Sequence, residues 1–231
     1  MEHRVVSHEE WLKSRKELLA REKEFTRARD ALSVARRELP WEKVEKDYVF
    51  TGPKGQETLA DLFAGKSQLI IYHFMFHPDW DEGCKSCSWW ADNFNGIDVH
   101  LKHRDISFLA VSRAPTAKLE AYKKRMVCSF KWLSSFGSDF NFDYGVSFTP
   151  EQIASGATIN YGAKNHFGEE IVGVSVFYKD SSGAIYHTFS TYSRGVDILN
   201  GAYNYIDLTP KGRDEGGRTQ YWVRRHDQYE D

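Results

Sequence analysis

The chain has 231 residues, of which 41% are hydrophobic and 15% aromatic, and this is enough apolar material for one sizeable core. Its 31 basic and 33 acidic side chains nearly cancel, so the bulk charge favours no nucleic acid partner. Because no stretch approaches the roughly 20 apolar residues that span a bilayer, and the start lacks the apolar centre of a signal peptide, we expect a cytoplasmic protein without a membrane partner.

The first predicted element is a long helix. From His8 to Leu39 the sequence is dense in charge and contains no Gly or Pro, and Pro40 closes it. Large apolar residues recur there every seven positions, at Trp11, Leu18, Phe25 and Leu32. This pattern predicts an amphipathic N-terminal arm over residues 1–40, which either packs along the main domain or pairs with a second copy in a homodimer. Residues 41–231 are then the main domain.

Strands and helices alternate through the middle of this domain. A short strand over 48–50 and a Gly-Pro turn predict a hairpin, and residues 58–63 predict one helical turn. The apolar run 69–76 is typical of a strand that is covered on both faces. The following stretches continue the alternation, with a helix over 90–101, a strand over 106–111, a helix over 119–126 and a strand over 130–134. This order predicts a mixed, mostly parallel central sheet with flanking helices.

The last third of the chain begins with a Gly- and Asn-rich stretch. Residues 139–170 show little periodicity, and we expect a loop-rich insertion there. Two strands over 173–179 and 184–192 follow, and the turn residues 180–183 join them into a hairpin. A helical pattern over 196–206 ends before Pro210.

Two cysteines three positions apart follow the first long strand. The order of strand, Cys-x-x-Cys, helix, strand, helix, hairpin and helix matches a thioredoxin-like fold, in which Cys84 lies at the start of a helix and Cys87 one turn further on. Unpaired amide groups and the helix dipole at such a position lower a cysteine pKa from about 8.5, and Lys85 adds a positive charge. The pattern predicts Cys84 as an attacking thiol and Cys87 as a resolving thiol.

The same pair is also half of a zinc site, so metal binding is an alternative. Structural zinc needs four ligands, and the further candidates are Cys128 and scattered histidines. On an extended strand His73 and His77 lie about 13 Å apart, which is too far to share one ion unless the strand ends before His77. We therefore expect no cofactor, with zinc as the less favoured prediction. Cys128 is expected to be a small buried apolar residue.

Several residues near the predicted strand ends are candidates for supporting roles. They are His77 and Asp79 for proton transfer, Trp80 and Trp89 for the wall of a pocket, and Lys85, Arg113 and Arg194 for binding an anion or stabilising the thiolate. Each has a structural alternative: a polar cap for the first two, core packing for the tryptophans, and surface ion pairs for the arginines.

The stretch YHFMFHPDWDEGCKSCSWWADNFNG resembles a bacterial thioredoxin-like family catalogued as domain of unknown function eight-nine-nine. The resemblance extends from EEWLKSRKELLAREKEFTRARD through HTFSTYSRG to QYWVRRHDQY. It implies a thioredoxin-like fold and leaves the activity open. The chain departs from thioredoxins in having no proline in 170–175, and from peroxiredoxins in carrying Asp81 three positions before Cys84.

The leading hypothesis is therefore a cytoplasmic thiol–disulfide oxidoreductase that acts on a protein or small-molecule thiol or disulfide. Two alternatives stay open. One is a thiol peroxidase of the peroxiredoxin type, which the early hairpin favours and the missing Pro/Thr pattern disfavours. The other is a non-catalytic protein that binds a ligand or metal on a thioredoxin-like fold.

Overall fold

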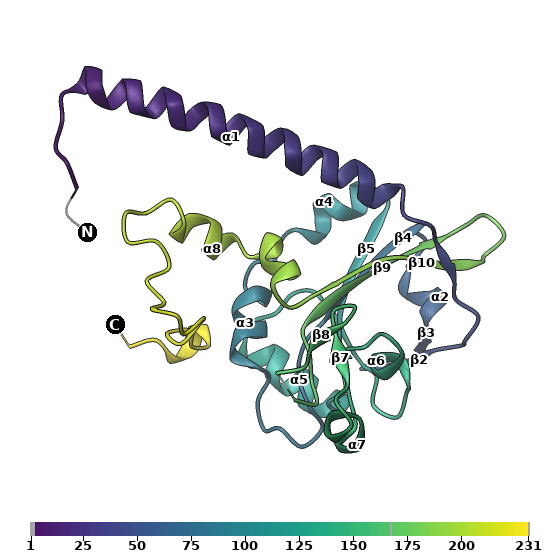
Figure 1. Cartoon of the computed structure of the whole chain (residues 1–231). Coiled ribbons are helices and arrows are strands. Elements are labelled where there is room, and N and C mark those ends of the chain that lie inside the picture. Colours follow the sequence, from purple (N-terminus) through teal and green to yellow (C-terminus); the bar gives the residue numbers. More distant parts are fainter. Residues whose placement is uncertain (1–2, 167, 231) are drawn as a thin grey trace. The chain divides into compact units, whose positions relative to one another are not determined.

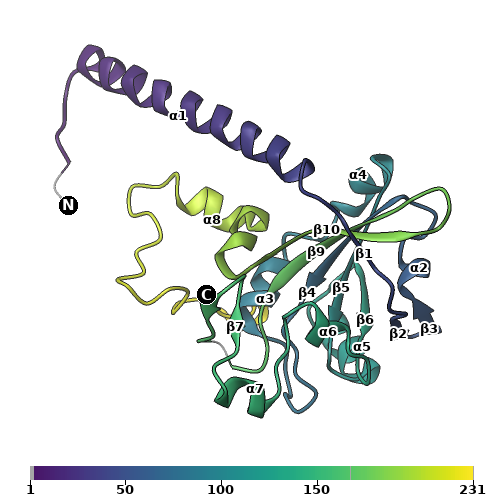
Figure 2. The same ribbon diagram turned by 45° about the vertical axis from the view of Figure 1, so that its right-hand side comes forward.

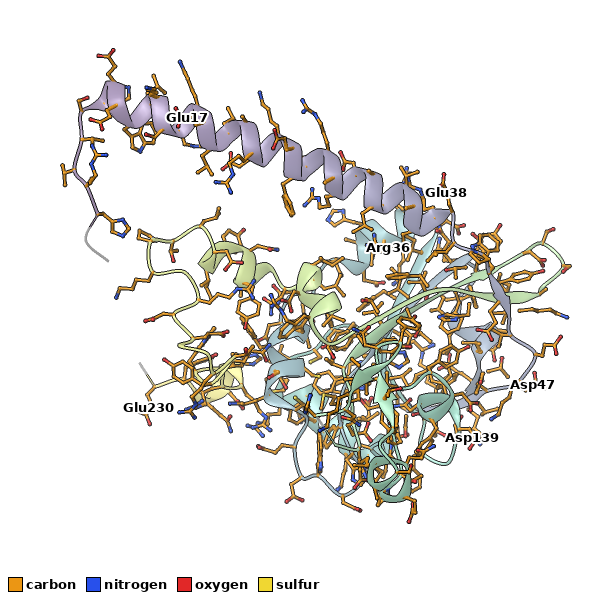
Figure 3. All side chains as sticks on the ribbon, in the orientation of Figure 1. Glu17, Arg36, Glu38, Asp47, Asp139 and Glu230 are labelled. Carbon is orange, nitrogen blue, oxygen red and sulfur yellow. The ribbon has the colours of Figure 1, made fainter. Side chains whose placement is uncertain are left out.

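The computed structural model describes residues 3–166 and 168–230. The chain divides into two compact units, Met1–Pro40 and Trp41–Asp231. The first unit contains α1 (His8–Arg37), whose start is capped by Ser7, because the Ser7 hydroxyl accepts a hydrogen bond from the Glu10 amide at 3.2 Å. No residue of α1 is buried, and its side chains project from the ribbon all along its length (Figure 3).

The second unit is built on a mixed β-sheet (Figure 1). In the part of the chain that the structure describes, eight strands form it in the order β1-β10-β9-β4-β5-β6-β2-β3. Their bounds are β1 (Glu42–Lys43), β2 (Val49–Gly52), β3 (Gly55–Thr58), β4 (Gln68–His73), β5 (Ile106–Ser112), β6 (Lys131–Ser134), β9 (Gly173–Lys179) and β10 (Ile185–Tyr192).

The parallel part of the sheet is confined to its middle. β4, β5 and β6 run parallel to one another, whereas β9 pairs antiparallel with β4, and the pairs of β10 with β9, β1 with β10, β2 with β3 and β2 with β6 are also antiparallel. The expectation of a mostly parallel sheet thus holds only for these three strands, because hairpins at both edges add antiparallel neighbours. The thioredoxin-like arrangement itself is confirmed: β4, helix and β5 are followed by the β9–β10 hairpin and a final helix.

Helices cover both faces of this sheet (Figure 2). The helices and 3-10 turns of the second unit are α2 (Leu59–Leu62), α3 (Lys85–Ala91), α4 (Asp98–His103), α5 (Thr116–Arg125), α6 (Phe140–Asp143), α7 (Pro150–Ala154), η1 (Ser193–Leu199), α8 (Gly201–Ile206) and η2 (His226–Gln228). Among the described residues, no helix is both long and apolar enough to cross a bilayer.

Each face of the sheet has its own core. On one face, residues of α3, α5 and α8 pack on Tyr72, Phe74 and Trp132. On the other, residues of α2 and α6 pack on Leu69, Ile71 and Leu109. Burial on both faces explains why β4 and β5 are continuous apolar runs rather than alternating ones. β4 ends at His73, and a loop leads from there to the start of α3 at Lys85.

The segment 139–170 is less irregular than the sequence indicates. It contains α6, α7 and a small two-stranded sheet of β7 (Thr158–Ile159) and β8 (Ala163–Lys164). α7 starts with a capping box, in which Thr149 and Gln152 bind each other's backbone amides. The segment has a small core of its own, made of Phe148, Ile159 and Ile171.

Candidate active site

The loop after β4 brings Cys84 back beside the strand from which it came. The Cys84 amide donates a hydrogen bond to the Met75 carbonyl at 3.0 Å, so the two ends of this loop are pinned together. Gly83 makes the return feasible, because a Cβ there would lie 2.8 Å from the Phe74 ring and 2.9 Å from the Tyr122 ring. Cys84 is then the N-cap residue of α3, as the sequence predicts.

The Cys84 sulfur is stabilised as a thiolate by its surroundings. Both cysteines are free thiols, and Cys84 is partly exposed. The thiol of Cys87, the backbone amides of Cys87 and Ser86, and the charge of Arg225 together lower the pKa of Cys84 to about 6, against the opposing effect of burial. At neutral pH the side chain is therefore mostly an anion.

Cys87 has the opposite character. It is buried, and burial is the main reason that its pKa lies well above the usual range, with the neighbouring Cys84 as a further cause. The Met75 amide donates to its sulfur at 3.4 Å and, with the Tyr72 hydroxyl, acts to lower that pKa. One thiol of the pair is thus charged and accessible, and the other is protonated and enclosed.

The C-terminal stretch of the chain supplies the positive charge near Cys84. Arg225 donates to the Tyr122 hydroxyl at 2.8 Å and to the Gly83 carbonyl at 2.7 Å, and it pairs with Glu82 at 2.8 Å. These contacts hold the guanidinium beside the residue that precedes Cys84. Through them Arg225 ties the C-terminal stretch to the rest of the domain, and its charge also acts on the Cys84 thiol.

A cavity of about 650 Å³ opens over the two cysteines. Tyr72, Met75 and Trp90 line it, together with residues 193, 194, 196 and 197 of η1. Residues 218–221 form a further part of its wall. Trp90 Nε1 donates to the Val196 carbonyl at 2.9 Å, which ties η1 to α3.

Aromatic packing and one carboxylate hold the wall formed by 218–221. The Trp222 ring packs edge-on against Trp89 with centroids 5.1 Å apart. Glu215 accepts hydrogen bonds from Tyr203 Oη at 2.9 Å, from the Gln220 amide at 2.8 Å and from Trp222 Nε1 at 3.1 Å. Residues 218–221 are therefore held against the domain by packing and hydrogen bonds of this segment and its neighbours.

Of the seven predicted supporting residues, only some line the cavity. Lys85 and Arg194 do so. Trp89 is buried and lies behind the C-terminal wall, so it supports the cavity without lining it. The other four residues, His77, Asp79, Trp80 and Arg113, are not among the residues that line it in the described chain.

The residues outside the cavity have other partners. His77 Nδ1 accepts from the Asp79 amide at 3.1 Å, its Nε2 lies 3.2 Å from Glu169, and its ring is 6.1 Å from that of Trp80. Arg113 donates from Nε to the buried carboxylate of Glu170 at 2.6 Å. These contacts fit the cap and ion-pair alternatives, and a role of these residues in proton transfer stays a prediction.

Cys128 is not among the residues that line the cavity, and the described residues offer no ready set of metal ligands. Burial is the main cause that raises the pKa of Cys128 to about 11, and its side chain packs against the core. Within residues 3–166 and 168–230, no three His, Cys, Asp or Glu side chains are grouped so as to hold a metal ion. Zinc held by Cys84 and Cys87 would thus need ligands from elsewhere.

Three residues of the site escape reasoning from the sequence. Tyr72 lies within the mostly apolar strand β4, Ser193 follows β10, and Arg225 is about 140 positions from the cysteines along the chain. The closing stretch QYWVRRHDQY contains Arg225, but nothing in it indicates that this arginine lies near Cys84. Nothing in the local pattern distinguishes Tyr72 from its neighbours in the core.

Comparison with known proteins gives a family and distant likenesses in fold. The family model described as "Bacterial protein of unknown function (DUF899)" matches residues 1–229. No curated protein matches the sequence.

Solved structures that resemble the chain have low sequence identity. The peroxidoxin BcpB from Mycobacterium tuberculosis is 13% identical with a TM-score of 0.47, over 73% of this chain and 97% of that one. A peroxiredoxin-like protein from Aquifex aeolicus is 11% identical with a TM-score of 0.45, over 73% and 87%. A thiol:disulfide interchange protein from Bacteroides sp. is 11% identical with a TM-score of 0.41, over 76% and 95%. At these scores the likenesses carry no conclusion about function.

Proposed function

Since the chain belongs to the DUF899 family of bacterial proteins of unknown function, we propose an activity from its own site: a cytoplasmic thiol–disulfide oxidoreductase. Cys84 is the attacking thiol and Cys87 the resolving thiol. The observation that carries the proposal is the contrast between them, a partly exposed thiol with a pKa lowered to about 6 next to a buried, protonated one, below an open cavity.

The reaction follows from this contrast. The Cys84 thiolate attacks one sulfur of a disulfide, so a mixed disulfide forms at Cys84 and the first substrate thiolate leaves. Cys87 then loses its proton and attacks the Cys84 sulfur, which closes a Cys84–Cys87 disulfide and releases the second substrate thiolate. The substrate gains two electrons and two protons in total, and an external dithiol reduces the protein again.

The assignment of roles is tested by replacing each cysteine separately. Reduced protein is mixed with a small disulfide, quenched with acid and analysed by mass spectrometry. We expect an intramolecular disulfide in the parent chain, a stable mixed disulfide in Cys87→Ser and no adduct at neutral pH in Cys84→Ser. Cys128→Ser serves as the matched control and should behave like the parent. An unreactive parent chain, or an adduct on Cys128, would refute the proposal.

A thiol peroxidase is the second candidate, because the hairpin of β2 and β3 precedes β4 at the sheet edge and Cys84 carries an accessible thiolate. In that case Cys84 would attack a peroxide oxygen, becoming a sulfenic acid as water leaves, and Cys87 would condense with it. Reduced protein is therefore also mixed with hydrogen peroxide. Oxidation no faster than that of free cysteine excludes this candidate, and zinc analysis of protein purified without chelator examines the metal-binding alternative.

A further inference from the structure

The cavity over Cys84 has a polar feature that its own residues do not satisfy. Tyr72 is fully buried and lines this cavity beside Cys87, and its hydroxyl, which interacts with the Cys87 thiol, has no oxygen or nitrogen partner among the described residues. Buried hydroxyl groups are normally paired, because leaving one without a partner after desolvation is unfavourable. An occupant of the cavity with a polar group at this depth would complete the pairing.

Ser193 adds a second such group to the lining of the cavity. Its Oγ is buried without a partner in the described chain, and the residue lines the same cavity. Its backbone has a φ of 50°, a left-handed conformation that is unfavourable for residues other than Gly, and its amide donates to the Val172 carbonyl at 3.1 Å. Strained residues with unpaired polar groups cluster at ligand sites.

The rim of the cavity carries mainly positive charge. Lys85, Arg194 and Arg218 line it together with a single carboxylate, Asp197. Arg194 pairs with Asp197 at 3.3 Å, and Arg213 approaches the same carboxylate at 3.6 Å. Since Asp197 is shared between these two arginines, the rim as a whole favours a ligand with negative charge.

The size of the cavity points to a small molecule. About 650 Å³ lies within the range of pockets that enclose drug-sized ligands, roughly 300–1,000 Å³. The lining also includes the apolar side chains of Met75, Trp90, Val172 and Val196. A ligand that matches this lining has a polar or sulfur-bearing group, an apolar part and a negatively charged group.

We propose that the cavity binds a low-molecular-weight disulfide that carries carboxylates, with its sulfur at Cys84 and a carboxylate at Arg194 and Arg218. The hydroxyls of Tyr72 and Ser193 bind carbonyl or amide groups of the same molecule. This substrate class rests on the proposed oxidoreductase function. In the reaction, two small thiols leave in place of one disulfide, the protein cysteines become a disulfide, and a dithiol such as dithiothreitol restores them.

The test compares three disulfides that differ in charge. Reduced protein is mixed at low ionic strength with oxidised glutathione, which is anionic, bis(2-hydroxyethyl) disulfide, which is neutral, and cystamine, which is cationic. Each second-order rate constant is divided by that of the same disulfide with free dithiothreitol. We expect the ratio to be at least tenfold higher for the anionic disulfide than for the cationic one, and the difference to shrink in high salt.

Substitutions at the rim show whether the preference comes from this cavity. Arg194→Gln combined with Arg218→Gln should lower the ratio for the anionic disulfide about tenfold and leave that for the neutral one unchanged. Arg104→Gln, at an exposed arginine outside the cavity lining, is the matched control and should change neither ratio.

The possible results distinguish a failure of the proposed substrate class from a failure of the proposed oxidoreductase function. Equal ratios for the three disulfides, with normal closure of the Cys84–Cys87 disulfide, would overturn the substrate class and leave the oxidoreductase function standing. The same holds for a charge preference that survives the double substitution. Failure of all three disulfides to oxidise the pair would overturn both.

Discussion

At the scale of single residues, burial and hydrogen bonding drive the pKa values of Cys84 and Cys87 in opposite directions, although the two thiols share one helical turn. Cys84 gains donors and a nearby cation, whereas Cys87 loses contact with water. Such a difference gives the attacking thiol its charge and keeps the resolving thiol protonated until a mixed disulfide forms.

The first prediction concerns Arg225. Its charge contributes to the low pKa of Cys84, so Arg225→Gln should raise that pKa and slow alkylation of Cys84 at pH 6 roughly threefold, the equivalent of about 0.7 kcal/mol. Arg225→Lys keeps the charge and should restore most of the rate. Arg224→Gln is the control, because Arg224 donates to the Tyr221 and Val223 carbonyls instead. Equal loss in the Lys and Gln variants would indicate a purely structural role.

The second prediction concerns Tyr72. The hydroxyl of Tyr72 acts to lower the pKa of Cys87, so Tyr72→Phe should leave Cys87 less readily deprotonated. With bis(2-hydroxyethyl) disulfide, which has no carbonyl or amide group for this hydroxyl to bind, we expect normal attack by Cys84 but slower closure of the protein disulfide, so that the mixed disulfide accumulates in acid-quenched samples. Closure at the parent rate would show that the hydroxyl does not assist Cys87. Folding stability should change little, because the hydroxyl has no oxygen or nitrogen partner among the described residues and its interaction with the Cys87 sulfur is a weak one.

At the scale of elements, the site depends on pieces that are distant in sequence. The end of β4, the start of α3, η1 and residues 218–221 meet around one cavity, and none of these contacts follows from a local pattern. Contacts between residues that are distant in the sequence also attach the segment 139–170 to the rest of the domain. Glu170, at its end, accepts a hydrogen bond from Arg113 after β5, and another from Ser147 at 2.9 Å.

The third prediction is a pH dependence of stability set by Glu170. Burial raises the pKa of this carboxyl to about 7, against the opposing effects of Arg113 and Ser147. Between the ordinary value of about 4.5 and 7 the folded state therefore holds a proton that the unfolded state has lost, so the free energy of unfolding falls as pH rises. The loss should be about 3 kcal/mol over this window, at roughly 1.36 kcal/mol for each pKa unit.

Urea unfolding at several pH values measures this loss. Glu170→Gln removes the titrating group, so the corresponding part of the pH dependence should disappear. A free energy of unfolding that rises over the same window in the parent chain would show that the ion pair with Arg113 keeps the carboxyl charged in the folded state.

Across the whole molecule, periodicity in the sequence located most of the long helices and strands but did not reveal where a helix is interrupted. The N-terminal helix, the strands that became β4, β5 and β6, and the β9–β10 hairpin lie close to their predicted bounds. The single helix predicted over 90–101 is two helices, α3 and α4, and the one over 196–206 is η1 followed by α8, which starts at an Asn200 cap. An apolar stripe continues across such breaks because both pieces face the same core.

The candidate site was predictable only in part, for a related reason. The Cys-x-x-Cys spacing after an apolar run locates Cys84 and Cys87, since a strand followed by a helix places them at a helix start. The cavity needs contacts between the middle and the end of the chain, such as those of Arg225 with Gly83 and of Trp222 with Trp89. These contacts join residues that are far apart in the sequence, so a local pattern cannot predict them. Tyr72 could not be singled out because its neighbours in the strand are buried apolar residues as well.

The fourth prediction concerns assembly through α1. Its heptad residues are exposed by 53% at Trp11, 48% at Leu18, 68% at Phe25 and 59% at Leu32, a spacing that suits pairing with a second copy. We expect sedimentation analysis to give a dimer for the full chain and a monomer for Leu18→Glu combined with Phe25→Glu. Ser33→Glu, on the same helix, is the control. A parent chain that sediments as a monomer would refute this assembly.

Activation of Cys84 as a thiolate can be measured by the pH dependence of its alkylation in the reduced full-length protein. The rate constant for Cys84, followed by mass spectrometry of its peptide, should rise to half of its maximum near pH 6, because the thiolate alone reacts. A midpoint at or above about 8.5, as for a free thiol, would contradict the account.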